Sequence, residues 1–264
     1  MHYTINCHLL FKEYPLFERA AAAKAAGFDY VEYWWPFNEA EPDSKAIQAF
    51  IDAIKASGTQ LTGLNFFAGD MPAGDRGLVS WAARQAEFRA NVPVALAIGQ
   101  ALGCQAYNAL YGNRQPGEAP GEADRIGFDN LVFAAQAAQA VGAKVLLEPI
   151  SGSPAFPLKT AADCFAILDR LEQAGTTNVQ FLCDLYHLAA NGDNPDTVLE
   201  RYASRTGHVQ IADFPGRGEP GSGTLPLADW LAKLRRAGYD GPVGLEYNPT
   251  GATADSFAHL PTLD

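Results

Sequence analysis

The sequence predicts a single α/β domain, a closed (β/α)8 TIM barrel that takes up the whole of residues 1–264. Three observations carry this prediction: a helix–glycine–strand unit recurs along the chain, the expected strands are short and mostly apolar, and the units together with an opening strand number eight. Parallel strands need a crossover helix between them, so helices that alternate with apolar strands indicate a parallel sheet covered on its outer face.

The repeated unit is an alanine- and leucine-rich helix, then a glycine, then a short β-like run. It occurs at residues 25–34, 56–66, 101–110, 140–149, 174–184, 205–213 and 236–247. Each glycine is expected to end a helix in the left-handed conformation, which a residue without Cβ adopts most easily; these are Gly27, Gly58, Gly103, Gly142, Gly175, Gly207 and Gly238. With residues 3–8 as an opening strand, the units reach the number that closes a barrel.

A doubly wound open sheet is the alternative architecture. It usually brings a G-x-G-x-x-G turn after an early strand, and none follows residues 3–8 or 29–34. The stretches 112–121 and 215–226 are rich in glycine and proline, but each follows an expected strand. We therefore interpret them as active-site loops rather than as domain boundaries.

The composition suits one globular domain and disfavours nucleic acid and membranes as partners. The 264 residues are 48% hydrophobic and 19% charged, which suits one large domain with a proper core. A formal charge of −11 disfavours nucleic acid, whose binding needs lysine and arginine against phosphates. The first fifteen residues hold no basic leader followed by an apolar stretch, so we expect a cytoplasmic protein without a membrane partner.

The cysteines lie far apart and form no C-x-x-C pair. This spacing predicts separate buried thiols rather than a disulfide framework or a thiolate zinc site. They are Cys7, Cys104, Cys164 and Cys183.

Oxygen-bearing side chains end four consecutive expected strands: Glu148, Asp184, Gln210 and Glu246. Reacting groups in such a barrel come from the carboxyl ends of the strands, and three carboxylates meeting there would repel one another without a cation. Oxygen ligands favour Mg²⁺ or Mn²⁺ over Zn²⁺. Any one of these residues could instead cap the next helix or pair with an arginine, but the joint pattern favours a metal site.

Two residues in the following loops are candidate substrate contacts. His187 comes three positions after Asp184, where it would bond a substrate oxygen or support a metal ligand; the alternative is a helix-start histidine bonded to backbone. Arg217 follows the seventh expected strand, and its forked cation suits a substrate carboxylate. The alternative for Arg217 is a salt bridge to Glu219.

Several further polar or aromatic residues stand near the expected barrel mouth. His208 shares the inward face of Gln210 but lies one layer deeper, so we expect a hydrogen-bonded core histidine rather than a ligand. Trp34–Trp35 and residues 66–70 either wall the site or belong to the core or a subunit interface. Pocket-lining positions near the ends of the first four strands, unless they only serve turns, are Asn6, His8, Glu32, Asn65 and Asn108.

Five segments of the chain resemble the hydroxypyruvate isomerase family, within the larger group of xylose-isomerase-like barrels. They read LNFFAGDMPAGDRGL, LEPI, CDLYH, HVQIADFPGRGEPGSG and GLEYNP, and the resemblance extends from residue 1 to about residue 250. It implies that Glu148 and Glu246 are the catalytic acid/base pair and that these two, with Asp184 and Gln210, hold the metal. Related sugar epimerases usually have histidine at the position of Gln210, so its glutamine favours the isomerase branch. The segment 151–160 is shorter and less polar than the family pattern, which leaves the role of this loop open.

The resemblance implies interconversion of hydroxypyruvate and tartronate semialdehyde through a metal-stabilised enediolate, with Arg217 on the substrate carboxylate. By analogy, several copies of the chain would assemble into a homo-oligomer. One alternative is an isomerase or epimerase of a longer sugar or sugar acid, such as a 2-oxo-tetronate or a ketohexose. A DNA-repair endonuclease on the same barrel is opposed by the charge of −11 and by only five histidines. A non-catalytic sugar-acid-binding barrel is opposed by two carboxylates poised at a metal.

Overall fold

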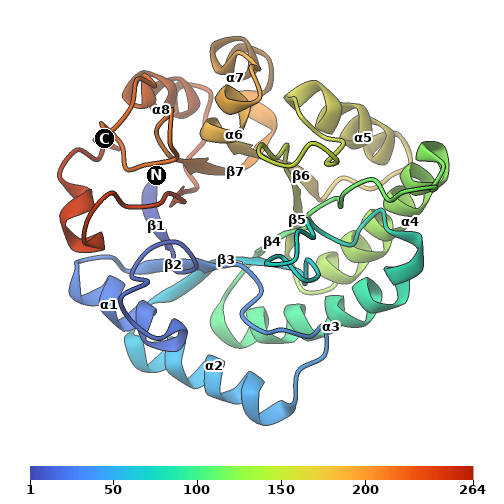
Figure 1. Cartoon of the computed structure of the whole chain (residues 1–264), viewed down its shortest axis with the longest axis horizontal. Helices are drawn as coiled ribbons and strands as arrows, with labels where there is room; N and C mark the ends of the chain where they lie inside the picture. The colour runs from blue at the N-terminus through green and yellow to red at the C-terminus, as the bar shows by residue number, and fades with distance from the viewer. Residues whose placement is uncertain (264) are drawn as a thin grey trace.

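The computed structural model describes residues 1–263 and has the predicted closed barrel of eight parallel strands. Each strand pairs with the next along the chain, and β1 also pairs with β8, which closes the ring (Figure 1). The strands are β1 (His2–Asn6), β2 (Tyr30–Tyr33), β3 (Gln60–Asn65), β4 (Ala106–Asn108), β5 (Lys144–Leu147), β6 (Val179–Asp184), β7 (Thr206–Ile211) and β8 (Pro242–Leu245).

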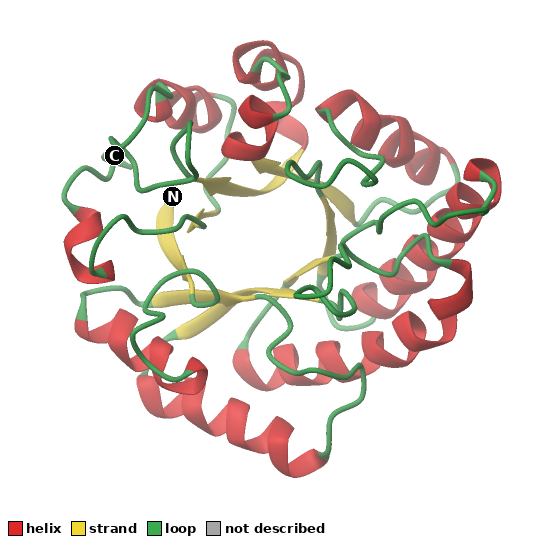
Figure 2. Cartoon of the chain, viewed as in Figure 1, coloured by secondary structure: helices red, strands yellow, loops and turns green. Residues whose placement is uncertain are grey.

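The helices form a layer outside the ring of strands (Figure 2). The crossover between β6 and β7 holds two α-helices and a 3-10 helix, Ala203–Arg205, and another 3-10 helix, Thr253–Phe257, follows β8. The α-helices are α1 (Arg19–Ala25), α2 (Ser44–Ser57), α3 (Gln85–Leu102), α4 (Pro120–Gln139), α5 (Ala161–Gln173), α6 (Leu185–Ala190), α7 (Pro195–Tyr202) and α8 (Leu227–Arg236). No helix among residues 1–263 is long and apolar enough to cross a membrane.

The glycines of the repeated unit mark helix ends in six of the seven copies. Gly27, Gly58, Gly103, Gly142, Gly175 and Gly238 all have φ between 69° and 96°, the left-handed conformation expected of them. The prediction for Gly207 was wrong, because this residue lies inside β7 without a positive φ. A Cβ there would stand 2.5 Å from Oε1 of Gln180 on β6, so its role is close packing between neighbouring strands.

Two separate apolar clusters make up the core. The larger one fills the space between the outer face of the sheet and the helices, and the small one holds Ala106, Leu146 and Leu182 on three neighbouring strands. Side chains alternate between the two faces of a strand, so Leu146 and Leu182 share a face with Glu148 and Asp184, two residues further on. The carboxyl ends of these strands therefore deliver polar groups to the barrel mouth.

The cysteines are buried and unpaired, as predicted from their spacing.

Candidate active site

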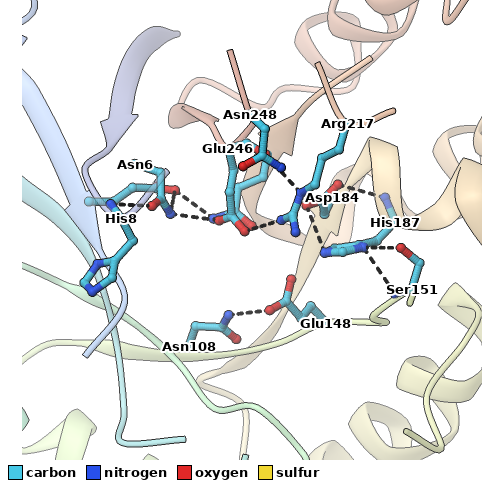
Figure 3. A network of polar contacts seen from close by, with 12 residues as sticks. Asn6, His8, Asn108, Glu148, Ser151, Asp184, His187, Arg217, Glu246 and Asn248 are labelled. Atoms are coloured by element: carbon cyan, nitrogen blue, oxygen red, sulfur yellow. Dashed lines mark hydrogen bonds and ion pairs between the residues drawn. The ribbon is translucent and has the colours of Figure 1, made fainter. Parts of the chain in front are cut away.

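The four residues predicted at the strand ends come together at the mouth of the barrel. Glu148 and Glu246 directly follow β5 and β8, Asp184 is the last residue of β6, and Gln210 is the penultimate residue of β7. Their exposed fractions are only 6%, 5%, 1% and 4%, in that order. Figure 3 shows Glu148, Asp184 and Glu246 arranged around one space, with Arg217 between Glu246 and Asp184.

The buried carboxylates of Glu148, Asp184 and Glu246 repel one another, and their pKa values are raised. Burial, and next the charge of Asp184, raise the pKa of Glu148 to about 8. Burial also raises the pKa of Asp184 to about 6 and that of Glu246 well above its ordinary value, although Arg217 opposes both shifts. A divalent cation would remove this repulsion and keep all three groups ionised.

The amide of Gln210 leaves an acceptor free beside these carboxylates. Its Nε2 donates to Oε2 of Glu246 at 2.5 Å and to Oε1 of Glu32 at 2.7 Å. Its Oε1 is buried and has no hydrogen-bond partner, which is costly unless a cation or ligand meets it. Carboxylates and a free amide oxygen are donors that suit a divalent cation.

Asp184 both caps a helix and faces the cluster. Its Oδ1 accepts the backbone N–H of His187 at 2.9 Å, which caps α6, so the helix-cap alternative expected from the sequence also occurs. Its Oδ2 lies 3.7 Å from Nε2 of His187. The possible ligand atoms of three residues, Glu148, Asp184 and His187, lie within 4.8 Å of one another. His187 is therefore next to two of the predicted metal ligands.

His187 is held in one tautomer by Ser151. The backbone N–H of Ser151 donates to Nδ1 of His187 at 3.1 Å, and the Ser151 hydroxyl lies 2.7 Å from the same nitrogen. Burial lowers the pKa of His187 well below its ordinary value, so the ring is neutral. Because Nδ1 accepts, the ring proton sits on Nε2, which makes His187 a hydrogen-bond donor toward the cluster.

Arg217 contacts a carboxylate of the cluster rather than Glu219. Its Nη2 donates to Oε1 of Glu246 at 2.6 Å and its Nε to the Glu246 carbonyl at 3.3 Å. Its guanidinium lies 5.5 Å from the centroid of the Tyr186 ring. Glu219 instead accepts the backbone N–H and hydroxyl of Thr250. The alternative salt bridge expected from the sequence is thus absent.

A cavity of about 430 Å³ opens above the cluster. Its lining joins the two glutamates with polar side chains from several loops. The residues that bear on the chemistry are Glu148, Glu246, His187, Arg217, Asn65, Ser151 and Arg76, and Trp34, Met71 and Pro72 add apolar wall. The size is typical of a pocket for a small molecule.

The remaining candidate substrate contacts lie at different distances from this cavity. Asn65 lines it, whereas Asn108 lies beneath and donates from Nδ2 to Oε1 of Glu148 at 2.6 Å. His8 lines a neighbouring cavity of about 480 Å³ and stacks on Trp34 with 5.4 Å between ring centroids. Figure 3 shows the His8 ring turned away from the carboxylate of Glu246.

Several residues that the structure brings to the site had no specific role predicted from the sequence. Arg76 lines the cavity from the loop after β3. It lies inside a segment that carries the family resemblance, and this position could have predicted it as a site residue. Glu32 and Asn6 stand near strand ends but were expected only to line the pocket. His208 is the core histidine that the sequence predicted, since its Nε2 lies 2.8 Å from Oε2 of Glu32.

Comparison with known proteins shows the family to which the chain belongs. Residues 20–263 match the family model described as "Xylose isomerase-like TIM barrel", so fold and site define a member of that group. The chain belongs, within it, to the hydroxypyruvate isomerase family: it is 50% identical to a Streptomyces coelicolor protein named "Putative hydroxypyruvate isomerase" over 98% of this chain and 95% of that one. The predicted fold class and the resemblance are both confirmed.

Two further relatives are similar over nearly their full lengths. The chain is 32% identical to a protein of Cupriavidus necator named "2-oxo-tetronate isomerase", covering 98% of this chain and 96% of the other. A crystal structure titled as an AP endonuclease, family 2, from Brucella melitensis superposes with a TM-score of 0.87 at 30% identity, covering 97% of this chain and 96% of that one. The names of the curated relatives agree with the predicted class, a sugar isomerase.

Proposed function

We propose that this protein is a metal-dependent aldose–ketose isomerase that interconverts hydroxypyruvate and tartronate semialdehyde, with residues 1–264 acting as one domain. The observation that carries the proposal is the pair Glu148 and Glu246, which line one cavity. Glu148 also lies within 4.8 Å of ligand atoms of Asp184 and His187. The 50% identical relative named as a hydroxypyruvate isomerase supports the choice of substrate. The substrate is a small molecule, in line with a cavity of about 430 Å³.

Glu148, Asp184, Gln210 and Glu246 would hold the metal, Mg²⁺ or Mn²⁺. Their support is the burial of all four and the free Oε1 of Gln210. A divalent ion bound there would act as a Lewis acid toward the substrate oxygens and favour loss of the adjacent C–H proton. His187 offers a protonated Nε2 to this space, which suits a substrate oxygen better than a cation.

The proton transfer needs two groups that can exchange protons with adjacent carbons. Hydroxypyruvate loses a proton from C3 to give an enediolate. A proton returned to C2, together with transfer of the hydroxyl proton from O3 to O2, gives tartronate semialdehyde. Glu148 has one oxygen bonded to Asn108, and the residue lines the cavity. We assign Glu148 the transfer at C3 and Glu246 the transfer at C2, with roles exchanged in the reverse direction.

Arg217 and Asn65 complete the proposed substrate contacts. Arg217 donates two N–H groups to Glu246, and its other N–H groups remain for a substrate carboxylate at the cavity wall. Asn65 lines the same cavity and offers an amide to a substrate hydroxyl. His8 would contact only a substrate that extends into the neighbouring cavity.

The test is conversion of hydroxypyruvate by purified protein with Mg²⁺ or Mn²⁺, compared with an EDTA-treated sample and with Glu148→Gln and Glu246→Gln. We expect metal-dependent turnover that both variants lose by at least about a hundredfold, the lower range for a positioned acid or base. In D₂O, the product should carry deuterium at the carbon that receives the proton. Turnover that is indifferent to EDTA and to both substitutions would refute the proposal.

A longer sugar acid is the second candidate substrate, because the cavity is large for a three-carbon acid and one relative is named 2-oxo-tetronate isomerase. A four-carbon 2-oxo acid with a higher kcat/KM than hydroxypyruvate would favour it. The solved relative titled AP endonuclease raises nuclease activity as a further outcome. The net charge of −11 argues against it, and an abasic-site DNA cleavage assay with the same metals should be negative.

A further inference from the structure

Glu32 is a buried carboxylate below the cavity that the proposed chemistry does not use. It stands on β2 and is 3% exposed. Its Oε1 accepts Nε2 of Gln210 at 2.7 Å, and its Oε2 lies 2.8 Å from Nε2 of His208. Both partners are on β7, so the Glu32 side chain reaches across the strands β1 and β8 that separate β2 from β7.

The path of this side chain is kept open by two glycines. A Cβ at Gly244 on β8 would stand 2.7 Å from Oε1 of Glu32 and 2.8 Å from Cγ of Gln210, closer than real contacts allow. A Cβ at Gly63 on β3 would stand 3.3 Å from Cβ of Glu32. The contact between Glu32 and Gln210 therefore depends on the absence of a side chain at position 244.

The contact fixes which way round the Gln210 amide is held. Nε2 donates to Oε1 of Glu32 and to Oε2 of Glu246, and Oε1 of Gln210 is left without a partner. A reversed amide would set its oxygen against one carboxylate oxygen of Glu32 and one of Glu246, and both contacts would be repulsive. Asn6 strengthens the same arrangement, because its Nδ2 bridges Oε1 of Glu32 and Oε2 of Glu246 at 3.3 and 2.9 Å.

We propose that Glu32 is a positioning residue that locks the Gln210 amide with its oxygen toward the metal, while His208 holds Glu32 in place. This inference rests on the metal site of the proposed function and not on the identity of its substrate. A neutral amide can bind a cation only through its oxygen, whereas either oxygen of a carboxylate can bind one. The orientation of a glutamine ligand must therefore be fixed, and that of a carboxylate need not be. Residues that orient ligands in this way affect metal affinity directly.

The experiment is titration of metal-stripped protein with Mn²⁺, followed by calorimetry and by the electron paramagnetic resonance signal of free Mn²⁺. Glu32→Gln keeps the volume but leaves one acceptor oxygen for the side chains of Gln210, Asn6 and His208, so we expect the Kd for Mn²⁺ to rise about 10- to 100-fold. In Glu32→Gln/Gln210→Glu, either oxygen of residue 210 can bind the ion and the amide at 32 can donate to the other. Its Kd should return to within about threefold of wild type, a coupling between contacting residues.

Asp163→Asn is the matched control. Asp163 is another hydrogen-bonded carboxylate, in the capping box of α5, and its loss should lower thermal stability without changing the Kd for Mn²⁺. Wild-type affinity in Glu32→Gln would overturn the proposal. A double variant that binds no more tightly than Glu32→Gln would also overturn it, because Glu32 would then act on the fold rather than on the side chain at position 210.

A crystal structure of the wild-type protein with Mn²⁺ tests the same point if Glu32→Gln does not fold. Gln210 should bind the ion through Oε1 and keep Nε2 on Glu32; an amide that is reversed or not a ligand refutes the lock. Failure of the proposed activity is a separate result, since a protein that binds Mn²⁺ but does not turn over hydroxypyruvate leaves the affinity comparison intact.

Discussion

Nη2 of Arg217 donates to Oε1 of Glu246 at 2.6 Å, and the same guanidinium lies 5.5 Å from the Tyr186 ring centroid. The pair is mostly buried, with side-chain exposures of 20% and 6%. Arg217 has φ of 58°, so its loop is bent to bring the cation to the barrel mouth. Glu246 thus has a fixed cationic partner on one oxygen and the amides of Asn6 and Gln210 on the other.

Replacement of Arg217 tests this pairing. Arg217→Met leaves Glu246 without its cation, and loss of one partner of a buried charge pair costs about 2–5 kcal/mol. We expect kcat/KM to fall by roughly 10²–10³-fold in steady-state kinetics, with a smaller loss in Arg217→Lys, which keeps the charge but not the fork.

Glu219→Gln is the control for Arg217. Glu219 stands on the same loop, but its partner is Thr250 and not Arg217. We therefore expect kinetics close to wild type for Glu219→Gln. An effect as large as that of Arg217→Met would indicate that the loop as a whole matters, rather than the contact with Glu246.

A second prediction concerns Asn108, whose Nδ2 donates to Oε1 of Glu148 at 2.6 Å and lowers the pKa of that carboxyl against the effect of burial. In Asn108→Ala the pKa of Glu148 should rise further, so the ascending limb of the pH–kcat profile should move to higher pH. A hydrogen bond to a charged group contributes about 1.5–3 kcal/mol, which predicts a roughly 10- to 100-fold lower kcat at neutral pH.

Asn130→Ala is the matched control for Asn108→Ala. Asn130 is an equally buried amide on α4, bonded to Val79, Gln85 and Arg89 and not to a carboxylate of the site. Its loss should lower stability and leave the shape of the pH profile unchanged. If both variants give the same profile, the bond between Asn108 and Glu148 does not tune the reaction.

The barrel could be predicted from the sequence because its signal is local and repeated. A glycine after each helix and a short apolar run are read from neighbouring residues, and a strand period of two decides that Glu148 shares a face with Leu146. The same local reading failed at Gly207, since a glycine also serves where two strands pack closely.

The partners of the site residues depend on contacts that are remote in sequence. His208 and Glu32 are 176 positions apart, and no local pattern predicts their pairing. A salt bridge between Arg217 and Glu219 was the alternative prediction because the two residues are neighbours in the chain. The conformation of the loop depends instead on Asp213, whose carboxylate accepts the backbone N–H of residues 214, 221 and 225. The strand ends thus predicted which residues gather, but not how they are bonded.

The buried carboxylates predict an unusual pH dependence of stability for the metal-free protein. The pKa values of Glu148 and Asp184 rise from ordinary values of 4.5 and 3.8 to about 8 and about 6. At a pH between the ordinary and the raised pKa of either group, that group is protonated in the folded state and ionised in the unfolded state. The folded state then holds more protons, so the free energy of unfolding falls as pH rises. Thermal melts of the metal-free protein should show a falling Tm from pH 5 to pH 8.

Addition of Mn²⁺ should reverse this trend. Protons compete with the metal for the carboxylates, so the gain in Tm should be larger at pH 8 than at pH 5. Glu148→Gln should flatten the slope of the metal-free protein, because it removes one of the shifted groups. A metal-free Tm that rises toward pH 8, or an equal gain from Mn²⁺ at both pH values, would contradict the metal-site assignment.

The last prediction concerns the loop that presents Arg76 to the cavity. Gly77 has φ of 108°, and a Cβ there would stand 1.9 Å from the carbonyl oxygen of Leu110 in the next loop. Its N–H also bonds the Ala68 carbonyl at 2.9 Å. Gly77→Ala therefore combines backbone strain with a clash against backbone, and we expect it to destabilise the protein by more than about 3 kcal/mol in urea unfolding.

Gly74→Ala separates the two effects. Gly74 has φ of 113° in the same loop, but a Cβ there would meet no atom within 4 Å. Its cost should be the backbone strain alone, about 1–2 kcal/mol. Because the loop sets the position of Arg76, Gly77→Ala should also raise KM for the substrate, whereas Gly74→Ala should leave it near wild type. Equal losses of stability in the two variants would show that the close approach of Gly77 to Leu110 does not hold the loop.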